Sequence, residues 1–169
     1  MPRIFFKFIQ FYLPFLGAGI YVKRVNRSKN DFLIGMKYRF YNKNAHGTHF
    51  GGSLYSMCDP WYMFIIGGYL GTDYVVWDKA ASITFKRPGR AHVSARFHIP
   101  LEELANIKRT VDQQVTTDFE FTTQVLDDNN AVIAEIHKTI YANTKQAYKE
   151  RLAQRKQCAK QSSEESIAS

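Results

Sequence analysis

The sequence predicts an α+β protein in which one antiparallel sheet wraps around a single long helix. Its 169 residues are 45% hydrophobic and 15% aromatic, which supplies the core of one domain and excludes a chain that is disordered throughout. Several segments alternate apolar and polar residues with the period of two that is typical of strands. The segment from about residue 51 to 70 is almost continuously apolar and too long for an ordinary strand, so it is expected to be a buried helix. Strands and helices do not alternate as βαβ units, which favours an antiparallel sheet.

The first expected element is a short helix over residues 4–15, because apolar side chains recur there at three- and four-residue spacings. Pro14 and the glycines at positions 17 and 19 should end it. We interpret its aromatic stripe as a packing face. The alternative is that the stripe lies on a lipid surface.

The expected strands cover residues 20–25, 32–41, 74–85, 91–99, 116–126 and 132–141, with a helical turn over residues 101–108. In the second strand, Met36, Tyr38 and Phe40 should share the face opposite Lys37 and Arg39, because successive side chains of a strand point to opposite faces. This is the pattern of a sheet with one face in water.

Pro60 lies inside the predicted long helix. It should remove a backbone hydrogen bond and kink the helix, at a cost of about 3 kcal/mol in an ordinary helix. Stability alone does not favour proline at this position.

The positive charge of the chain is concentrated near its C-terminus. The formal net charge is +8, and six basic residues fall between Lys145 and Lys160. No segment interleaves basic and aromatic residues as nucleic-acid-binding motifs do, so nucleic acid is not an expected partner. We therefore expect one domain over residues 1–144, whose first 16 residues form the N-terminal helix, and a basic tail over residues 145–169 that is helical and ends in disorder.

The cysteine pattern argues against a disulfide scaffold and against a metal centre. Cys58 and Cys158 are far apart in the sequence and form no metal-binding spacing with histidine. No secretory signal is visible, and Asp59 followed by Pro60 interrupts the longest apolar window. The expected location is the cytoplasm, with no transmembrane segment.

A glycine-rich stretch from residue 44 to 59 leads into the predicted long helix. It resembles the motif of hotdog-fold acyl-coenzyme A thioesterases of the phenylacetic-acid-pathway type: an Asn, then His-Gly-Gly six residues later, then an Asp seven residues after the second Gly. The matching residues are Asn44, Gly51, Gly52 and Asp59. Phe50 replaces the His of the motif, and His49 stands one position earlier.

A second resemblance covers residues 15–141 and is closer. It is to an uncharacterised branch of hotdog proteins described as tetrameric thioesterases, and it rests on segments 47–55, 59–60, 77–81 and 87–90. The resemblance implies a hotdog fold, an acyl-coenzyme A substrate, a homodimer or homotetramer, and no cofactor apart from the coenzyme A of the substrate. Fold by itself does not establish the activity.

Chemistry gives these residues plausible roles in thioester hydrolysis, which needs activated water or a nucleophile, and a donor for the oxyanion. Backbone N–H groups of Gly51 and Gly52 at a helix N-terminus suit the oxyanion. Asp59 suits a general base or a nucleophile, and Asn44 suits the orientation of water or of the carbonyl. Alternatively, the glycines permit close packing and Asp59 satisfies polar groups at the kink.

The other polar residues near the motif have weaker assignments. His46 and His49 are secondary candidates, because a histidine near a turn is more often a structural hydrogen-bonding residue. The basic residues expected at the phosphates of coenzyme A are Lys86, Arg87 and Arg90.

The spacing of Gly51 and Asp59 has a consequence for assembly. Eight residues of helix separate them by roughly 12 Å, too far for one thioester carbon to contact both. Two antiparallel copies of the helix would place each glycine opposite the partner's aspartate, so we expect a site shared across a dimer. Two other functions stay open: a non-catalytic protein that binds acyl-coenzyme A or lipid, and a scaffold at a membrane surface.

Overall fold

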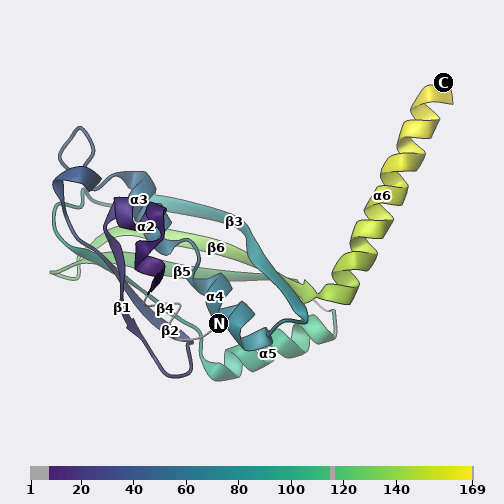
Figure 1. Cartoon of the computed structure of the whole chain (residues 1–169), viewed down its shortest axis with the longest axis horizontal. Helices are drawn as coiled ribbons and strands as arrows, with labels where there is room; N and C mark the ends of the chain where they lie inside the picture. Colours follow the sequence, from purple (N-terminus) through teal and green to yellow (C-terminus); the bar gives the residue numbers. More distant parts are fainter. Residues whose placement is uncertain (1–7, 115–116, 169) are drawn as a thin grey trace.

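A computed structural model describes residues 8–114 and 117–168. Six strands form a single antiparallel sheet in the order β1-β2-β4-β5-β6-β3, curved around two consecutive helices, α3 and α4 (Figure 1). The strands are β1 (Ile20–Val25), β2 (Asp31–Met36), β3 (Tyr74–Phe85), β4 (Val93–His98), β5 (Asp118–Asp127) and β6 (Val132–Thr144). The helices are η1 (Ile9–Phe11), α2 (Leu13–Ala18), η2 (Phe40–Asn42), α3 (Gly51–Cys58), α4 (Trp61–Leu70), α5 (Leu101–Asp112) and α6 (Lys145–Ala168). The predicted α+β architecture is confirmed.

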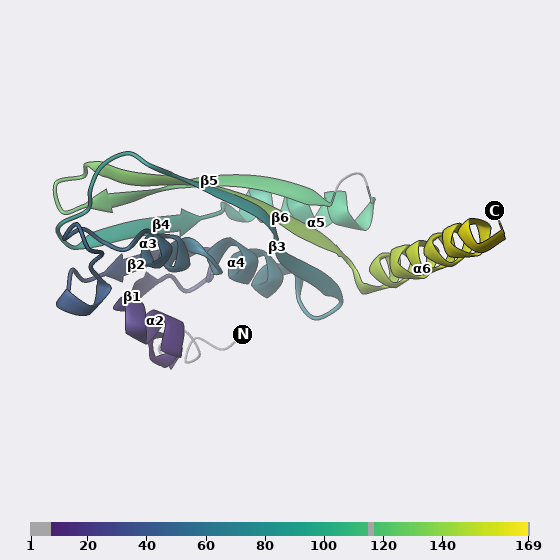
Figure 2. The ribbon, with the colours of Figure 1, turned by 90° about the horizontal axis from the view of Figure 1, so that it is seen from above.

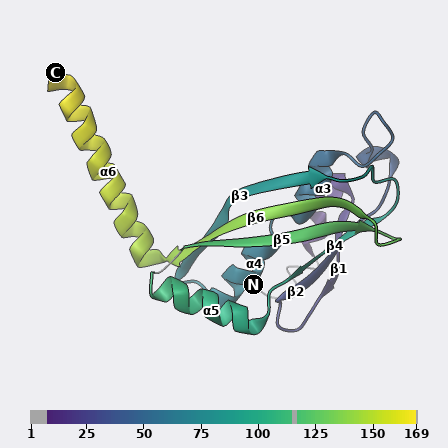
Figure 3. The same ribbon diagram turned by 180° about the vertical axis from the view of Figure 1, so that it is seen from behind.

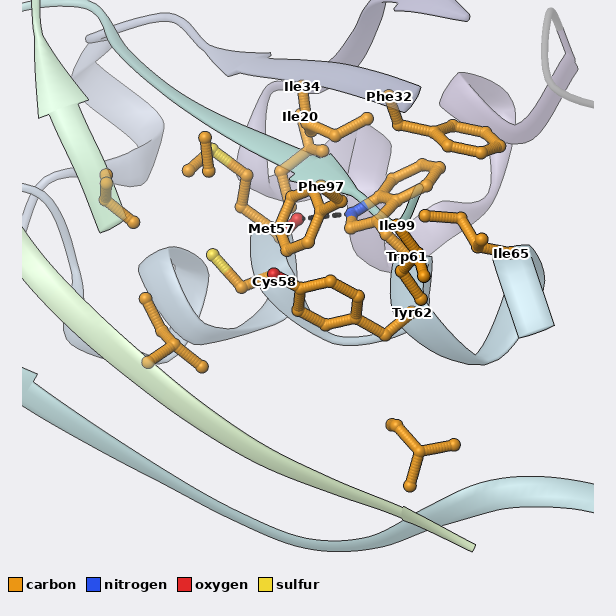
Figure 4. Close-up of a cluster of buried hydrophobic side chains, with 14 of the residues drawn as sticks. Ile20, Phe32, Ile34, Met57, Cys58, Trp61, Tyr62, Ile65, Phe97 and Ile99 are labelled. Atoms are coloured by element: carbon orange, nitrogen blue, oxygen red, sulfur yellow. Dashed lines mark hydrogen bonds between the residues drawn. The ribbon is translucent and has the colours of Figure 1, made fainter. Parts of the chain in front are cut away.

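The core lies between the concave face of the sheet and the central helices. Trp61, at the start of α4, is fully buried and packs against Phe32 of β2 and Phe97 of β4, with ring centroids 5.6 and 6.3 Å apart (Figure 4). Its indole N–H donates a hydrogen bond to the carbonyl of Met57 at 2.6 Å. Burying rings of this size supplies much of the apolar stabilisation of a domain, so this cluster fixes the central helices against the sheet.

The predicted long helix is two helices. α3 ends at Cys58, Asp59 is its C-cap, and Pro60 is the N-cap of α4. A proline before a helix sacrifices no intrahelical hydrogen bond, because the first N–H groups of a helix have no partner within it. The break therefore avoids most of the cost of a proline inside a helix, and it places Asp59 at a helix end.

The N-terminal segment differs from the expected helix over residues 4–15. The structure has the short helix η1 and then α2, and the first part of the expected helix, residues 4–7, lies outside the described residues. Pro14 stands in the first turn of α2 and opens the helix rather than ending it, as its fixed φ favours. Phe15 is buried against Trp61, whereas Phe11 stays exposed, so the aromatic stripe packs only in part. Figure 2 shows α2 on the side of the central helices away from the sheet.

The second predicted strand is too long. β2 ends at Met36, and Phe40 is 86% exposed in η2, so the predicted shared face of residues 36, 38 and 40 is wrong. The reason is Asn42, which is buried and donates from Nδ2 to the carbonyls of Ala18 and Lys37 at 2.9 and 2.6 Å. These hydrogen bonds turn the chain away from the sheet.

The C-terminal helix α6 extends away from the sheet, and its described first turn packs on β3 and β6 (Figures 1 and 3). Tyr148 contacts Trp77, with ring centroids 5.0 Å apart, and Ala147 is buried. The structure continues the helix to Ala168, in keeping with the Ala, Lys, Gln and Glu content of the segment, and the expected disorder at its end stays a prediction. The division into a domain and a tail at residue 145 stays a prediction.

Candidate active site

The N-terminus of α3 presents backbone donors. Phe50 is its N-cap and makes no side-chain cap, and the first hydrogen bonds of the helix run from Ser53 and Leu54 to the carbonyl of Phe50. The N–H groups of Gly51 and Gly52 therefore precede the helical hydrogen bonds and carry the positive end of the helix dipole. A side chain at position 51 would come within 2.9 Å of a ring carbon of Phe85, so glycine also permits a close approach of β3.

A cavity of about 550 Å³ opens in front of this helix end, between the loop before α3 and the turn from β3 to β4. We call it the glycine cavity. Its lining includes the predicted site residues Asn44, His46, His49, Gly51, Lys86, Arg87 and Arg90. Fold topology thus brings the candidate oxyanion donor together with the three basic residues. Gly52 is exposed and is not part of the lining, and Asp59 lies elsewhere.

The amide of Asn44 is occupied by its own loop. Its Oδ1 accepts from the backbone N–H groups of His46 and Thr48 at 2.9 and 3.1 Å, and its Nδ2 donates to Thr48 Oγ1 at 2.7 Å. These contacts form a turn that shapes the approach to α3. Asn44 is therefore placed to hold the loop rather than to orient a substrate.

His49 and His46 differ in their surroundings. His49 is buried, its Nε2 lies 2.8 Å from the carbonyl of Ala91, and its ring packs against Tyr38. Burial lowers the pKa of His49, although the hydrogen bond to Ala91 partly opposes this, so the ring is neutral near pH 7. A neutral imidazole that contacts a carbonyl donates from Nε2, which leaves Nδ1 without a proton. Nδ1 is buried and has no hydrogen-bond partner within the part of the chain that the structure describes. His46 is exposed on the loop.

Asp59 occupies the other end of α3, where a buried lysine holds it. The side chain of Lys138 in β6 has no exposed surface, and its Nζ lies 3.1 Å from Asp59 Oδ1 and 3.1 Å from Asp78 Oδ1 in β3. Lys138 also donates to the hydroxyl of Tyr55 at 3.4 Å. The side chain of Asp59 is 49% exposed, so one face of its carboxylate contacts the ammonium and the other is open to a ligand.

The titration of this cluster follows from one ammonium serving two carboxylates. Burial lowers the pKa of Lys138, but Asp78 and Asp59 together outweigh it and the pKa lies above the usual value for lysine. Burial raises the pKa of Asp78, and the opposing effect of Lys138 is smaller. Lys138 is therefore charged at neutral pH, and the excess negative charge of the cluster lies on the carboxylates.

Lys138 was not among the residues that the sequence singled out, although the sequence contained a signal for it. Ile136 and Ile140 flank it at spacings of two, and both are fully buried. Period-two alternation places residue 138 on the same inward face, and a lysine at such a position needs a charged partner. Asp78 of β3 contacts Lys138, whereas the next residue, Lys79, pairs with Asp118 of β5.

The described residues contain no group of three or more His, Cys, Asp or Glu side chains arranged to hold a metal ion. No helix in the same residues is long and apolar enough to cross a membrane.

Solved structures of other proteins share this fold. PA5026 from Pseudomonas aeruginosa, a protein of unknown function described as a probable thioesterase, superposes with a TM-score of 0.69 at 14% identity, over 85% of this chain and 97% of that one. The thioesterase HI1161 from Haemophilus influenzae gives 0.57 at 12% identity, over 76% and 81%. PaaI from the phenylacetic acid degradation operon of E. coli gives 0.52 at 16% identity, over 73% and 79%.

These superpositions confirm the hotdog fold and the resemblance to thioesterase-like hotdog proteins. At such identities they establish the fold alone. The chain belongs to the family described as Domain of unknown function (DUF4442), whose sequence profile matches residues 2–142. No curated protein matches the chain.

Proposed function

We propose that this protein hydrolyses acyl-coenzyme A thioesters at a site shared by two subunits. The observation that carries the proposal is the Asp59 carboxylate, half exposed and held by the fully buried Lys138 at the end of a helix whose other end offers uncapped glycine N–H groups. Hydrolysis of a thioester needs a group that activates water and a donor for the oxyanion, and the carboxylate and the glycine N–H groups supply these two functions.

The reaction then follows in two steps. Asp59 accepts a proton from a water molecule while the oxygen of that water attacks the thioester carbonyl carbon. The oxyanion that forms accepts hydrogen bonds from the N–H groups of Gly51 and Gly52. The tetrahedral intermediate collapses, the carbon–sulfur bond breaks, and the coenzyme A thiolate takes the proton from Asp59. Lys138 contacts no substrate atom in this scheme. It fixes the orientation of the carboxylate, which makes it a positioning residue.

The separation of the two helix ends requires a second subunit. Gly51 and Asp59 lie roughly 12 Å apart along α3 and line different cavities. β3 is an edge strand of the sheet (Figure 3). Its middle residues Ala80 and Ala81 are small and exposed. An unpaired edge of this kind suits pairing with a second copy about a two-fold axis, which would set α3 of one subunit antiparallel to α3 of the other. Lys86, Arg87 and Arg90 at the rim of the glycine cavity would bind the phosphates of coenzyme A.

The test is Asp59→Asn, measured by release of coenzyme A from a series of acyl-coenzyme A substrates. We expect a loss of at least about 100-fold in kcat, since a general base contributes that much or more, with little change in the melting temperature. Asp73→Asn, on the exposed loop between α4 and β3, is the matched control and should be fully active. An Asp59→Asn variant as fast as the parent would exclude Asp59 as the catalytic group.

The shared site makes a separate prediction about assembly. Analytical ultracentrifugation at micromolar concentration should show a dimer or a larger assembly, because each active site needs Gly51 from one subunit and Asp59 from the other. A monomer that hydrolyses acyl-coenzyme A would contradict the shared site and leave only a site within one chain.

One observation favours a second candidate function, non-catalytic binding of acyl-coenzyme A. Phe50 stands where the related motif has histidine, is exposed beside the glycine N–H groups, and supplies no acid or base. Binding of acyl-coenzyme A in calorimetry, with no coenzyme A release by the parent protein, would support this alternative.

A further inference from the structure

A second cavity, of about 570 Å³, lies beside Asp59, between the N-terminal segment and the start of α4. We call it the aromatic cavity. Its lining residues are Phe8, Ile9, Phe11, Tyr12, Phe15, Asp59, Pro60 and Phe64. The volume falls within the roughly 300–1,000 Å³ of typical small-molecule sites. Among the described residues of this lining, Asp59 is the charged one, and the others are almost entirely apolar.

The N-terminal segment is anchored in a way that leaves this cavity open. Phe15 and Ile9 are buried, and the ring of Phe15 packs against Trp61 with centroids 5.9 Å apart. Phe8 and Phe11, by contrast, are 61% and 60% exposed. These two rings remain in water although the rest of their segment packs on the protein, so they lose the favourable free energy of burial. A contiguous exposed apolar surface of this kind indicates a binding site.

The position of Asp59 selects the occupant. We propose that the aromatic cavity binds the hydrocarbon chain of the acyl group, and therefore that the substrates are thioesters of extended apolar acids. This inference rests on the proposed function, because a thioester carbonyl that meets Asp59 places its apolar substituent next to Pro60 and Phe64. A membrane or an apolar protein surface over the same rings would bury the Asp59 carboxylate at a high desolvation cost, whereas an acyl chain leaves the carboxylate at the reacting end.

The inference makes a quantitative prediction about chain length. Each methylene that enters an apolar site adds favourable transfer free energy that corresponds to about a fourfold gain in kcat/KM. For the parent protein we therefore expect kcat/KM to rise steeply from acetyl- to medium-chain acyl-coenzyme A, and to level off once the cavity is filled.

The experiment compares Phe11→Ala with Phe40→Ala over this substrate series. Both rings are exposed, so neither variant should lose its fold, but only Phe11 lines the aromatic cavity. Phe11→Ala should lower kcat/KM about tenfold for the preferred chain, and the loss should become smaller as the acyl chain becomes shorter. Phe40→Ala should match the parent throughout. Hydrolysis that is independent of chain length, or equal effects of the two variants, would overturn the acyl site while the thioesterase function stands.

Binding measurements separate the acyl site from catalysis. Calorimetry with acyl-coenzyme A on the Asp59→Asn background should show affinity that increases with chain length and is weakened by Phe11→Ala, even if no substrate is hydrolysed. Affinity that is indifferent to chain length on that background overturns the proposal. A second result would also overturn the proposal: the parent protein co-sediments with phosphatidylcholine vesicles, the Phe11→Ala variant does not, and both proteins have the same chain-length preference.

Discussion

Replacing Lys138 by methionine should destabilise the fold as well as disturb the proposed site. The change removes an ammonium with no exposed surface and leaves Asp78 and Asp59 facing each other without it. Removal of one partner of a fully buried ion pair costs about 3–5 kcal/mol. Here Asp59 is half exposed and Asp78 is 22% exposed, so water screens part of the loss and we expect about 3 kcal/mol or slightly less. For a chain of this length, that lowers the melting temperature by about 6–12 °C.

The pH dependence of the same variant tests the cause. Burial raises the pKa of Asp78, so the folded protein binds this proton more readily than the unfolded chain does. The neutral carboxyl of Asp78 therefore favours the folded state at low pH, and this contribution to stability is lost as the pH rises through the folded-state pKa of Asp78. Without Lys138 that pKa rises further, and the deficit of Lys138→Met should be largest near pH 7 and shrink toward pH 5.

Urea unfolding at several pH values measures these differences, and Lys138→Met/Asp78→Asn is the matched variant. The double variant removes the more buried of the two uncompensated carboxylates, so it should recover about 1 kcal/mol or more relative to Lys138→Met. A deficit below about 1 kcal/mol that does not change with pH, or a double variant less stable than either single variant, would refute the assignment of Lys138 as a buried ion-pair residue.

Two further predictions concern stability away from the site. Arg96 donates hydrogen bonds to both oxygens of Asp31 and holds the pKa of Asp31 below its usual value, so this pair stabilises the fold above about pH 4 and less as pH falls through the lower, folded-state pKa. Because Arg96 is more than half exposed, Asp31→Asn should lower the free energy of unfolding in urea by about 1 kcal/mol at pH 7 and not at all in strong acid. A loss of stability that is the same at every pH would contradict the ion pair. Truncation just after Tyr148 should leave the melting temperature unchanged, whereas truncation before Lys145 should lower the free energy of unfolding by about 1–2 kcal/mol because it uncovers Trp77. Equal melting temperatures of the two truncated proteins would show that the first turn of α6 contributes nothing to stability.

The predicted site residues fell into two groups that the linear sequence does not separate. Asn44, Gly51 and the basic turn at residues 86–90 share the glycine cavity, whereas Asp59 lines the aromatic cavity. The sequence predicted the distance between Gly51 and Asp59 along α3, because the rise per residue of a helix is a local property. Which cavity each residue enters depends on the packing of β3, the turn after it and the N-terminal segment.

The sequence by itself determined the parts of this protein that depend on local periodicity. Period-two alternation located all six strands, and the apolar run from residue 51 to 70 located the central helices, because these patterns report which face of an element must be buried. A kink at Pro60 was also predicted, since the missing N–H of proline is a local property, but the sequence did not predict that the helix divides there into α3 and α4.

Tertiary structure alone decided the features that depend on partners far away in the sequence. The end of β2 was set by hydrogen bonds from Asn42 to Ala18 and Lys37, and no local pattern announces such a turn. Lys138 gained its role only when β6 paired with β3 and packed on α3, which brought two carboxylates to its ammonium. A buried charge is tolerated only beside groups of opposite charge. The sequence contains these groups but does not show which of them lie close to Lys138 in the folded chain.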